Sequence, residues 1–240
     1  MLNERTVLLG LTTKGVSNWQ DKALEVKQLK IETAALLPTT LSFAERKRLY
    51  QMLEEAGLAE ATVVQLRPDM EQRELDYLVA RFKTKIFCCH ADEAGLKLID
   101  SLPKYHSMIY LANHDSEHSG KYFNQTVFEQ HQLTGICLDL SHLENQRNFS
   151  KNGYRRVQSL LNKYPLGCNM VSGISESVLL KLFKKSIDTH YLKSLDQLEY
   201  LRKFPSHYFA KLVVLQLENS FQEQLAIKKH LQNILEYMIQ

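Results

Sequence analysis

Short apolar runs alternate with longer amphipathic stretches along the whole chain. The apolar runs are rich in β-branched residues, and their polar residues gather at one end, which is typical of strands that are buried on both faces. Eight runs are expected to form strands: Thr6–Thr12, Ile31–Pro38, Ala61–Arg67, Lys85–His90, Ser107–Asn113, Gly135–Leu140, Gly167–Ile174 and Lys211–Glu218.

Two of the amphipathic stretches carry clear helix signals. Ser42 precedes Glu45 with the spacing of a capping box, and this stretch ends at Gly57. Ser220 and Glu223 repeat the capping-box spacing at the start of the last stretch. The apolar stripe expected on that last helix comprises Leu225, Ile227, Leu231, Ile234 and Leu235.

Eight strands that alternate with helices indicate one fold. Alternating βα units require parallel strands with right-handed connections. Eight such units in 240 residues predict an α/β fold, a single-domain (β/α)₈ TIM barrel over residues 1–240. No glycine-rich phosphate turn follows the first strand, which argues against an open dinucleotide-binding sheet. In such barrels the active site lies at the carboxyl ends of the strands.

Composition and charge exclude several classes of protein. The chain has 44% hydrophobic and 24% charged residues, and 30 basic residues against 27 acidic ones give a net charge of +3. This excess is too small to indicate a nucleic-acid partner. The apolar run near the N-terminus is too short for a signal peptide or a membrane span, so we expect a cytoplasmic protein without a membrane partner. Nothing in the sequence indicates the oligomeric state.

Four cysteines, Cys88, Cys89, Cys137 and Cys168, all lie in expected strands. Alternation along a strand points Cys88 and Cys89 to opposite faces, so they are poor partners for a disulfide. The spacing does not resemble a zinc pair or a secreted disulfide framework. We interpret all four as buried, reduced thiols.

Polar side chains at the strand ends are the candidates for chemistry. Asp139 and His142 follow the sixth strand and converge only if the strand ends near Leu140. Asp188 and His190 share one side of an extended segment. Carboxylate and imidazole suit a borderline divalent cation such as Zn²⁺ or Mn²⁺. The alternative is that Asp139 caps the next helix, His142 packs or meets water, and the second pair lies in a solvated loop.

Glu218 and His90 complete the candidate set. Alternation turns Glu218 and Gln216 away from the aliphatic face of the last strand, into the mouth of the barrel. By the same parity His90 follows Cys88 on the inward face; alternatively, it is a hydrogen-bonded histidine at a strand end. We predict catalytic roles for Glu218 and His90. The expected substrate-binding residues are Arg67, Asn113 and Asn219.

These residues together resemble a known family. The segment "GICLDLSH" resembles the strand-six motif of the xylose-isomerase-like TIM barrels, a superfamily that groups sugar isomerases and epimerases with metal-dependent apurinic-site endonucleases, and the likeness is greatest to uncharacterised bacterial members. A histidine after strand four, D-x-H after strand seven and a final strand ending L-E-N extend the resemblance over most of the chain. The resemblance implies metal-binding roles for His90, Asp139, His142, Asp188, His190 and Glu218.

Three positions depart from the family pattern. Ala112 stands where relatives carry a metal-bridging glutamate, and Met170 stands where they carry a histidine. The third-strand histidine of endonuclease-type members is also missing, with Gln65 and Arg67 in that region. Alanine cannot ligate and a thioether suits a hard cation poorly. The set His142, Asp188 and His190 stays intact, with the three-ligand pattern of a catalytic zinc site.

Three functions follow from these features. The first is a metal-dependent isomerase or epimerase acting on a small polar substrate, a sugar or sugar phosphate, through a partly eroded metal site. The second is a catalytically inactive binding or scaffold protein of the same fold, which Ala112 and Met170 favour. The third is endonuclease-like action on abasic DNA, against which the near-neutral charge argues. We place the third well behind the other two and expect no nucleic-acid partner.

Overall fold

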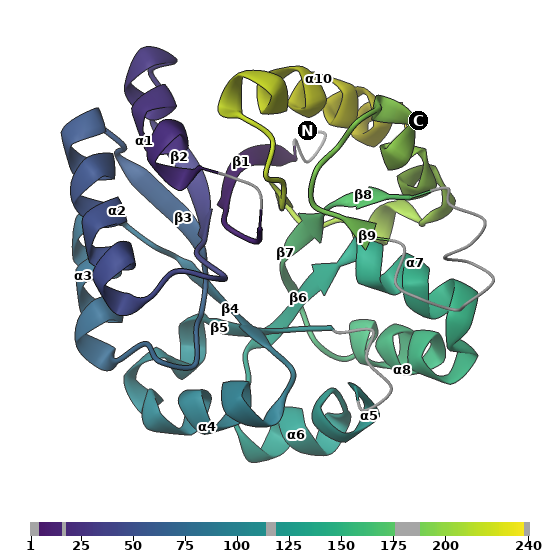
Figure 1. Ribbon diagram of the computed structural model, residues 1–240. Helices are drawn as coiled ribbons and strands as arrows, with labels where there is room; N and C mark the ends of the chain where they lie inside the picture. The colour runs from purple at the N-terminus through teal and green to yellow at the C-terminus, as the bar shows by residue number, and fades with distance from the viewer. Residues whose placement is uncertain (1–4, 16–17, 114–118, 176–187, 238–240) are drawn as a thin grey trace.

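A closed barrel of parallel strands forms the centre of the molecule (Figure 1). The computed structural model describes residues 5–15, 18–113, 119–175 and 188–237. Within these ranges the barrel order is β1-β2-β3-β4-β5-β6-β7-β10, which confirms the predicted (β/α)₈ TIM barrel. Its strands are β1 Thr6–Thr12, β2 Thr33–Leu37, β3 Glu60–Gln65, β4 Ile86–His90, β5 Ile109–Ala112, β6 Gly135–Asp139, β7 Leu166–Val171 and β10 Leu212–Leu215.

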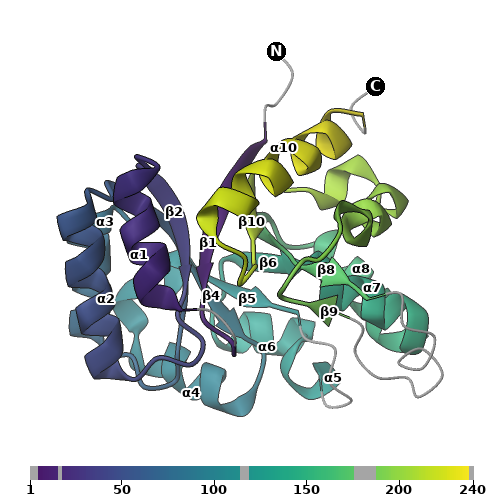
Figure 2. The same ribbon diagram turned by 45° about the horizontal axis from the view of Figure 1, so that its top comes forward.

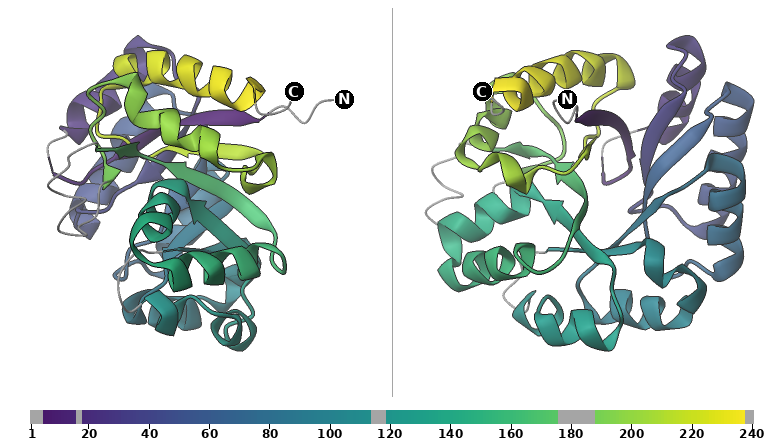
Figure 3. Two further views of the ribbon diagram at one scale, coloured as in Figure 1. Left: turned by 90° about the vertical axis from the view of Figure 1, so that its right-hand side faces the viewer. Right: turned by 180° about the vertical axis from the view of Figure 1, so that it is seen from behind.

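Helices surround the barrel on its outer side, as the views from the side and from behind show (Figure 3). The α-helices are α1 Trp19–Gln28, α2 Phe43–Ala56, α3 Gln72–Phe82, α4 Glu93–Ser101, α5 Ser119–Tyr122, α6 Gln125–Gln130, α7 Leu140–Phe149, α8 Lys151–Leu161 and α10 Phe221–Tyr237. The described ranges also contain the 3₁₀ helices η1 Pro103–Met108, η2 Leu195–Lys203 and η3 Ser206–Tyr208. Among the described helices, none has both the length and the apolar character that crossing a membrane requires.

The predicted helix signals at α2 are confirmed. The Ser42 side chain accepts the backbone N–H of Glu45, and the Glu45 carboxylate accepts the backbone N–H of Ser42, which completes the capping box. Gly57 ends the helix in the left-handed region at φ 87°. A side chain would strain that conformation, which explains why glycine stands there.

Helix α10 corrects one sequence prediction. Leu225 is 40% exposed, whereas Ile227, Leu231 and Ile234 are buried as expected. The preceding residue, Gln224, faces the barrel instead and is fully buried. The prediction for Leu225 was wrong because hydrophobicity alone selected it, while the seam between β1 and β10 binds the polar side chain of Gln224. Figure 2 shows α10 lying along this seam.

Two apolar layers hold the fold together. The outer layer joins the strands to the helices and includes Cys89, whereas the smaller inner layer fills the barrel and includes Cys88, Cys137, Cys168 and Met170. All four cysteines are buried and none forms a disulfide. The prediction that Cys88 and Cys89 face opposite sides is therefore confirmed, since strand alternation places them in different layers.

The seventh strand is shorter than predicted. The run Gly167–Ile174 divides at Ser172 into β7 and the short strand β8 Gly173–Ile174, which pairs antiparallel with β9 Asp188–Thr189. Ser172 is fully buried and donates its hydroxyl to the Ser141 hydroxyl at 2.7 Å. The β8–β9 pair places Asp188 beside the carboxyl end of the barrel.

Candidate active site at the barrel mouth

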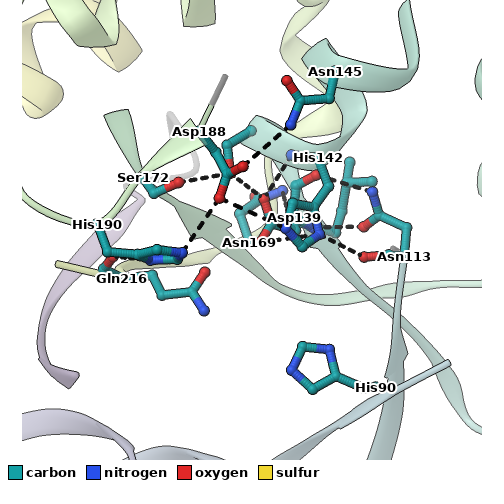
Figure 4. A network of polar contacts seen from close by, with 12 residues as sticks. His90, Asn113, Asp139, His142, Asn145, Asn169, Ser172, Asp188, His190 and Gln216 are labelled. Carbon is teal, nitrogen blue, oxygen red and sulfur yellow. Dashed lines mark hydrogen bonds and ion pairs between the residues drawn. The ribbon is translucent and has the colours of Figure 1, made fainter. Parts of the chain in front are cut away.

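Three side chains from two separate segments converge on the carboxyl end of the barrel (Figure 4). His142 lies in the first turn of α7, and Asp188 and His190 lie on and just after β9. The Asp188 Oδ2 atom is 3.3 Å from the His190 Nε2 atom and 4.0 Å from the His142 Nε2 atom. We call His142, Asp188 and His190 the imidazole–carboxylate set. The structure thus brings together the three residues that match the metal-binding positions of the resembled family without a substitution.

Backbone carbonyls fix the orientation of both imidazoles. The Nδ1 atom of His142 is 3.1 Å from the Asn113 carbonyl oxygen, and the Nδ1 atom of His190 is 3.1 Å from the Gln216 carbonyl oxygen. A carbonyl oxygen only accepts hydrogen bonds, so each Nδ1 carries a proton. In the neutral ring each Nε2 then presents a lone pair, and both are turned toward Asp188. Metal-binding histidines are commonly held by such outer contacts.

Asp139 shapes the turn from which His142 projects. Its Oδ1 atom accepts the backbone N–H of His142 at 3.0 Å and the hydroxyl of Ser141 at 2.5 Å, so it caps α7. Its Oδ2 atom is 3.7 Å from the His142 Nδ1 atom. The helix-capping alternative considered for Asp139 is therefore what the structure shows, and its predicted metal contact stays a prediction.

Lys14 is a site residue that the sequence reasoning missed. It follows β1 in the segment "TTKG", and its Nζ atom is 2.6 Å from the His190 Nε2 atom. An ammonium group only donates, so Nε2 of His190 accepts this hydrogen bond, which agrees with the orientation of the ring. The signal available was its place directly after a barrel strand, where a polar residue reaches the mouth.

Glu218 is held by the same turn. Its Oε1 atom accepts the backbone N–H groups of Lys14 at 2.7 Å and Gly15 at 2.5 Å, and the residue is only 8% exposed. Beneath it, the Lys22 Nζ donates to the Leu217 carbonyl oxygen at 3.0 Å. Burial lowers the pKa of Lys22 to about 8, although the charge of Glu218 opposes this shift. The mouth therefore places buried groups of both charges side by side.

A small cavity of about 10 Å³ lies deeper in the barrel, lined by His90, Gln65, Gln216, Ala112, Met170 and four neighbouring residues. The Nε2 atoms of Gln65 and His90 are in contact. The amide oxygens Oε1 of Gln65 and Gln216 are buried and accept no hydrogen bond. Each buried acceptor without a hydrogen bond destabilises the fold by about 1–3 kcal/mol. A ligand or a water molecule that donates hydrogen bonds to these two oxygens would remove that cost.

The predicted substrate-binding residues have other contacts. The Asn113 amide joins β5 to β6 through the backbone of Asp139, and the Asn219 amide bonds both the N–H and the carbonyl of Leu192. Arg67 donates to the Thr39 carbonyl oxygen and lies 3.6 Å from an Asp69 oxygen. These contacts position the turns of the mouth, and the predicted contacts with substrate stay predictions.

The residues present suit a divalent cation by their chemistry. Two imidazole nitrogens and one carboxylate are ligands that Zn²⁺ and Mn²⁺ accept. Buried Tyr200 lies close by and donates to the Ser172 carbonyl oxygen at 3.0 Å. Burial raises the pKa of the Tyr200 hydroxyl well above its usual value, and the charges of Asp139, Glu144 and Asp188 raise it further.

Comparisons with known proteins show the fold. No protein-family model and no curated protein matches the chain. Among solved structures, the chain is similar to an AP endonuclease, family 2, from Brucella melitensis, with a TM-score of 0.50 and 10% identity over 92% of this chain and 97% of that one. The apo 3-keto-D-glucoside 4-epimerase from E. coli has a TM-score of 0.48 and 14% identity over 95% and 99%. The first match confirms the predicted fold, a (β/α)₈ TIM barrel.

Proposed function

We propose that the protein binds a divalent cation between His142, Asp188 and His190 and acts on a small hydroxyl-rich substrate, a sugar or sugar phosphate. The observation that supports this most is that the His190 Nε2 atom, which accepts a hydrogen bond from Lys14, lies 3.3 Å from the Asp188 Oδ2 atom. Two acceptors at this distance repel unless positive charge lies between or beside them. When bound, a divalent cation polarises a carbonyl or hydroxyl group of a substrate.

The amide oxygens that line the deeper cavity support a hydroxyl-bearing substrate: at about 10 Å³ the cavity has room for one hydroxyl-sized group. The unsatisfied oxygens of Gln65 and Gln216 are acceptors, and hydroxyl groups are the donors that would satisfy them. Glu218 is the proposed proton carrier, because two backbone N–H groups hold its carboxylate at the rim of the mouth. Isomerisation or epimerisation by proton transfer would use these groups without an additional cofactor.

Lys14 supports a second candidate function, a binding protein that has lost turnover. Its ammonium group already lies on His190 Nε2 at 2.6 Å, where it supplies the positive charge that the set requires. Ala112 and Met170 line the adjoining cavity and offer no ligand for a hard cation. In this candidate the lysine replaces the cation, and the barrel binds a polar molecule without turning it over.

Metal binding separates the two candidates. In the first candidate, Mn²⁺ at 100 times its Kd is expected to raise the melting temperature by about 5–11 °C, the shift that about 2.7 kcal/mol gives in a protein of this size. Asp188→Asn should remove the shift, because the amide loses the charge that holds two imidazoles around the cation. The measurement is differential scanning calorimetry of chelator-treated protein with added metal.

Matched variants make this result specific. Asp196→Asn changes an exposed aspartate at the start of η2 and should leave the metal-dependent shift intact. Lys14→Met should keep or strengthen metal binding in the first candidate, since it removes the competing ammonium group. If neither the wild-type protein nor Lys14→Met shows an Asp188-dependent shift with Mn²⁺, the metal-dependent function is rejected in favour of the second candidate.

Proton exchange tests the proposed reaction. Incubation in deuterated water with a panel of ketoses and their phosphates is expected to place deuterium on the carbon next to the carbonyl, as followed by proton NMR. Glu218→Gln should slow this exchange at least 100-fold, because general acid–base groups contribute about 10²–10⁴-fold. Glu236→Gln, on the exposed side of α10, is the control. Equal exchange rates in the Glu218→Gln variant and the wild type would exclude Glu218 as the proton carrier.

A further inference from the structure

Three cysteines meet inside the barrel, below the mouth. Cys88 on β4, Cys137 on β6 and Cys168 on β7 belong to the inner layer and are at most 1% exposed. The Sγ atom of Cys168 is 3.4 Å from that of Cys88 and 3.4 Å from that of Cys137. We call these three residues the thiol cluster. Because Cys168 is 80 residues from Cys88 and 31 residues from Cys137, the sequence alone does not predict that their sulfur atoms are in contact.

The geometry suits a metal ion. All three Sγ atoms lie within 4.8 Å of one another, and among the described residues this is the only group of three His, Cys, Asp or Glu side chains that is so close. A metal–sulfur bond of about 2.3 Å places the sulfurs of a trigonal or tetrahedral site roughly 3.8–4.0 Å apart. The thiol cluster therefore reaches ligand spacing through shifts of a few tenths of an ångström.

We propose that the thiol cluster is a second cation site, which takes a thiophilic divalent ion such as Zn²⁺ or Cd²⁺ through three thiolates. Thiolates select soft and borderline ions over Mg²⁺ or Ca²⁺. Binding forms three metal–sulfur bonds and releases the three thiol protons, with no change of oxidation state. A divalent ion leaves a net charge of −1, which an apolar interior tolerates better than the −2 that a monovalent ion would leave.

The surroundings support ligation at this position. All three cysteines are free, so each sulfur is available as a ligand. Cys88 and Met170 also line the small cavity below the mouth, which leaves room there for one small fourth ligand such as water.

Titration with Cd²⁺ tests the proposal on the reduced, metal-free protein. One equivalent per chain is expected to produce the ultraviolet thiolate-to-cadmium band, and Cys168→Ser should weaken this binding at least tenfold. Cys89→Ser is the matched control, because Cys89 is adjacent in sequence but its sulfur lies in the outer layer near the Gly95 carbonyl oxygen at 3.5 Å. Asp188→Asn should leave the band unchanged, which separates this site from the imidazole–carboxylate set.

X-ray absorption provides a test that leaves all three residues of the thiol cluster unchanged. With one equivalent of Zn²⁺ bound to protein that also carries Asp188→Asn, three sulfur neighbours at about 2.3 Å are expected. A zinc shell of nitrogen and oxygen atoms would overturn the proposal. So would a cadmium band that is absent from folded, reduced protein, or one that Cys89→Ser weakens as much as Cys168→Ser does.

Discussion

Replacing Arg46 with methionine is expected to lower the free energy of unfolding by about 3–5 kcal/mol, because the change breaks a buried ion pair and leaves its partner charged. Arg46 on α2 is fully buried, and its Nε and Nη2 atoms donate to the two carboxylate oxygens of Glu74 on α3 at 2.7 and 2.9 Å. Tyr50 donates its hydroxyl to the same carboxylate at 2.8 Å. In a protein of this size the melting temperature should fall by about 6–20 °C, as thermal unfolding followed by circular dichroism would show.

Two further variants identify the cause of this loss. Arg81→Met breaks the more exposed pair that Arg81 makes with Glu54 and should cost at most about 1 kcal/mol. The double variant Arg46→Met with Glu74→Met removes both buried charges and should recover at least half of the loss, because the other carboxylate that binds Arg46, that of Asp69, is 47% exposed to water. A double variant as unstable as Arg46→Met alone would show that packing, and not the unpaired carboxylate, is responsible.

Replacing Gln224 with methionine is expected to cost about 3–5 kcal/mol, since several buried backbone groups lose their partner and each costs about 1–3 kcal/mol. β1 pairs with β10 only from Thr6 to Leu8. Beyond this point the Gln224 amide fills the seam: its Oε1 accepts the Gly10 N–H at 2.9 Å, and its Nε2 donates to the Gly10 and Asn219 carbonyl oxygens, each at 2.9 Å. Chemical denaturation measures the change.

Gln222→Met is the control for this variant. Gln222 is exposed on the same helix, and glutamine and methionine have similar helix propensities, so its stability should change by less than about 0.5 kcal/mol. If both variants lost the same stability, the loss would come from methionine in α10 in general and not from the contacts of Gln224 that close the barrel. Gln224 binds the carbonyl oxygen of Asn219, in the segment that follows β10. The Gln224→Met variant should therefore also show faster amide hydrogen exchange at the end of β10.

The eight strands and the capping signals could be predicted from the sequence because they depend on local properties. Burial on both faces makes each strand an apolar run, and Ser42 and Gly57 mark a helix by hydrogen bonding and by backbone freedom. The division of β7 at Ser172 could not be predicted in this way. It depends on the contact of Ser172 with Ser141, which comes from a different strand-to-helix turn.

The sequence by itself determined which side chains point inward, because successive residues of a strand alternate between its two faces. It also determined which residues lie at the carboxyl ends, because alternating strands and helices require parallel strands. Hence Asp188, His190, His142 and Glu218 were identifiable as candidates. Only the tertiary structure decided which of them meet, since their distances depend on how the barrel closes. It placed Lys14 on His190, directed Asp139 to a helix cap, and joined Cys88 to Cys168 across 80 residues. Contacts between distant strands are set by packing of the whole barrel, and no local pattern records them.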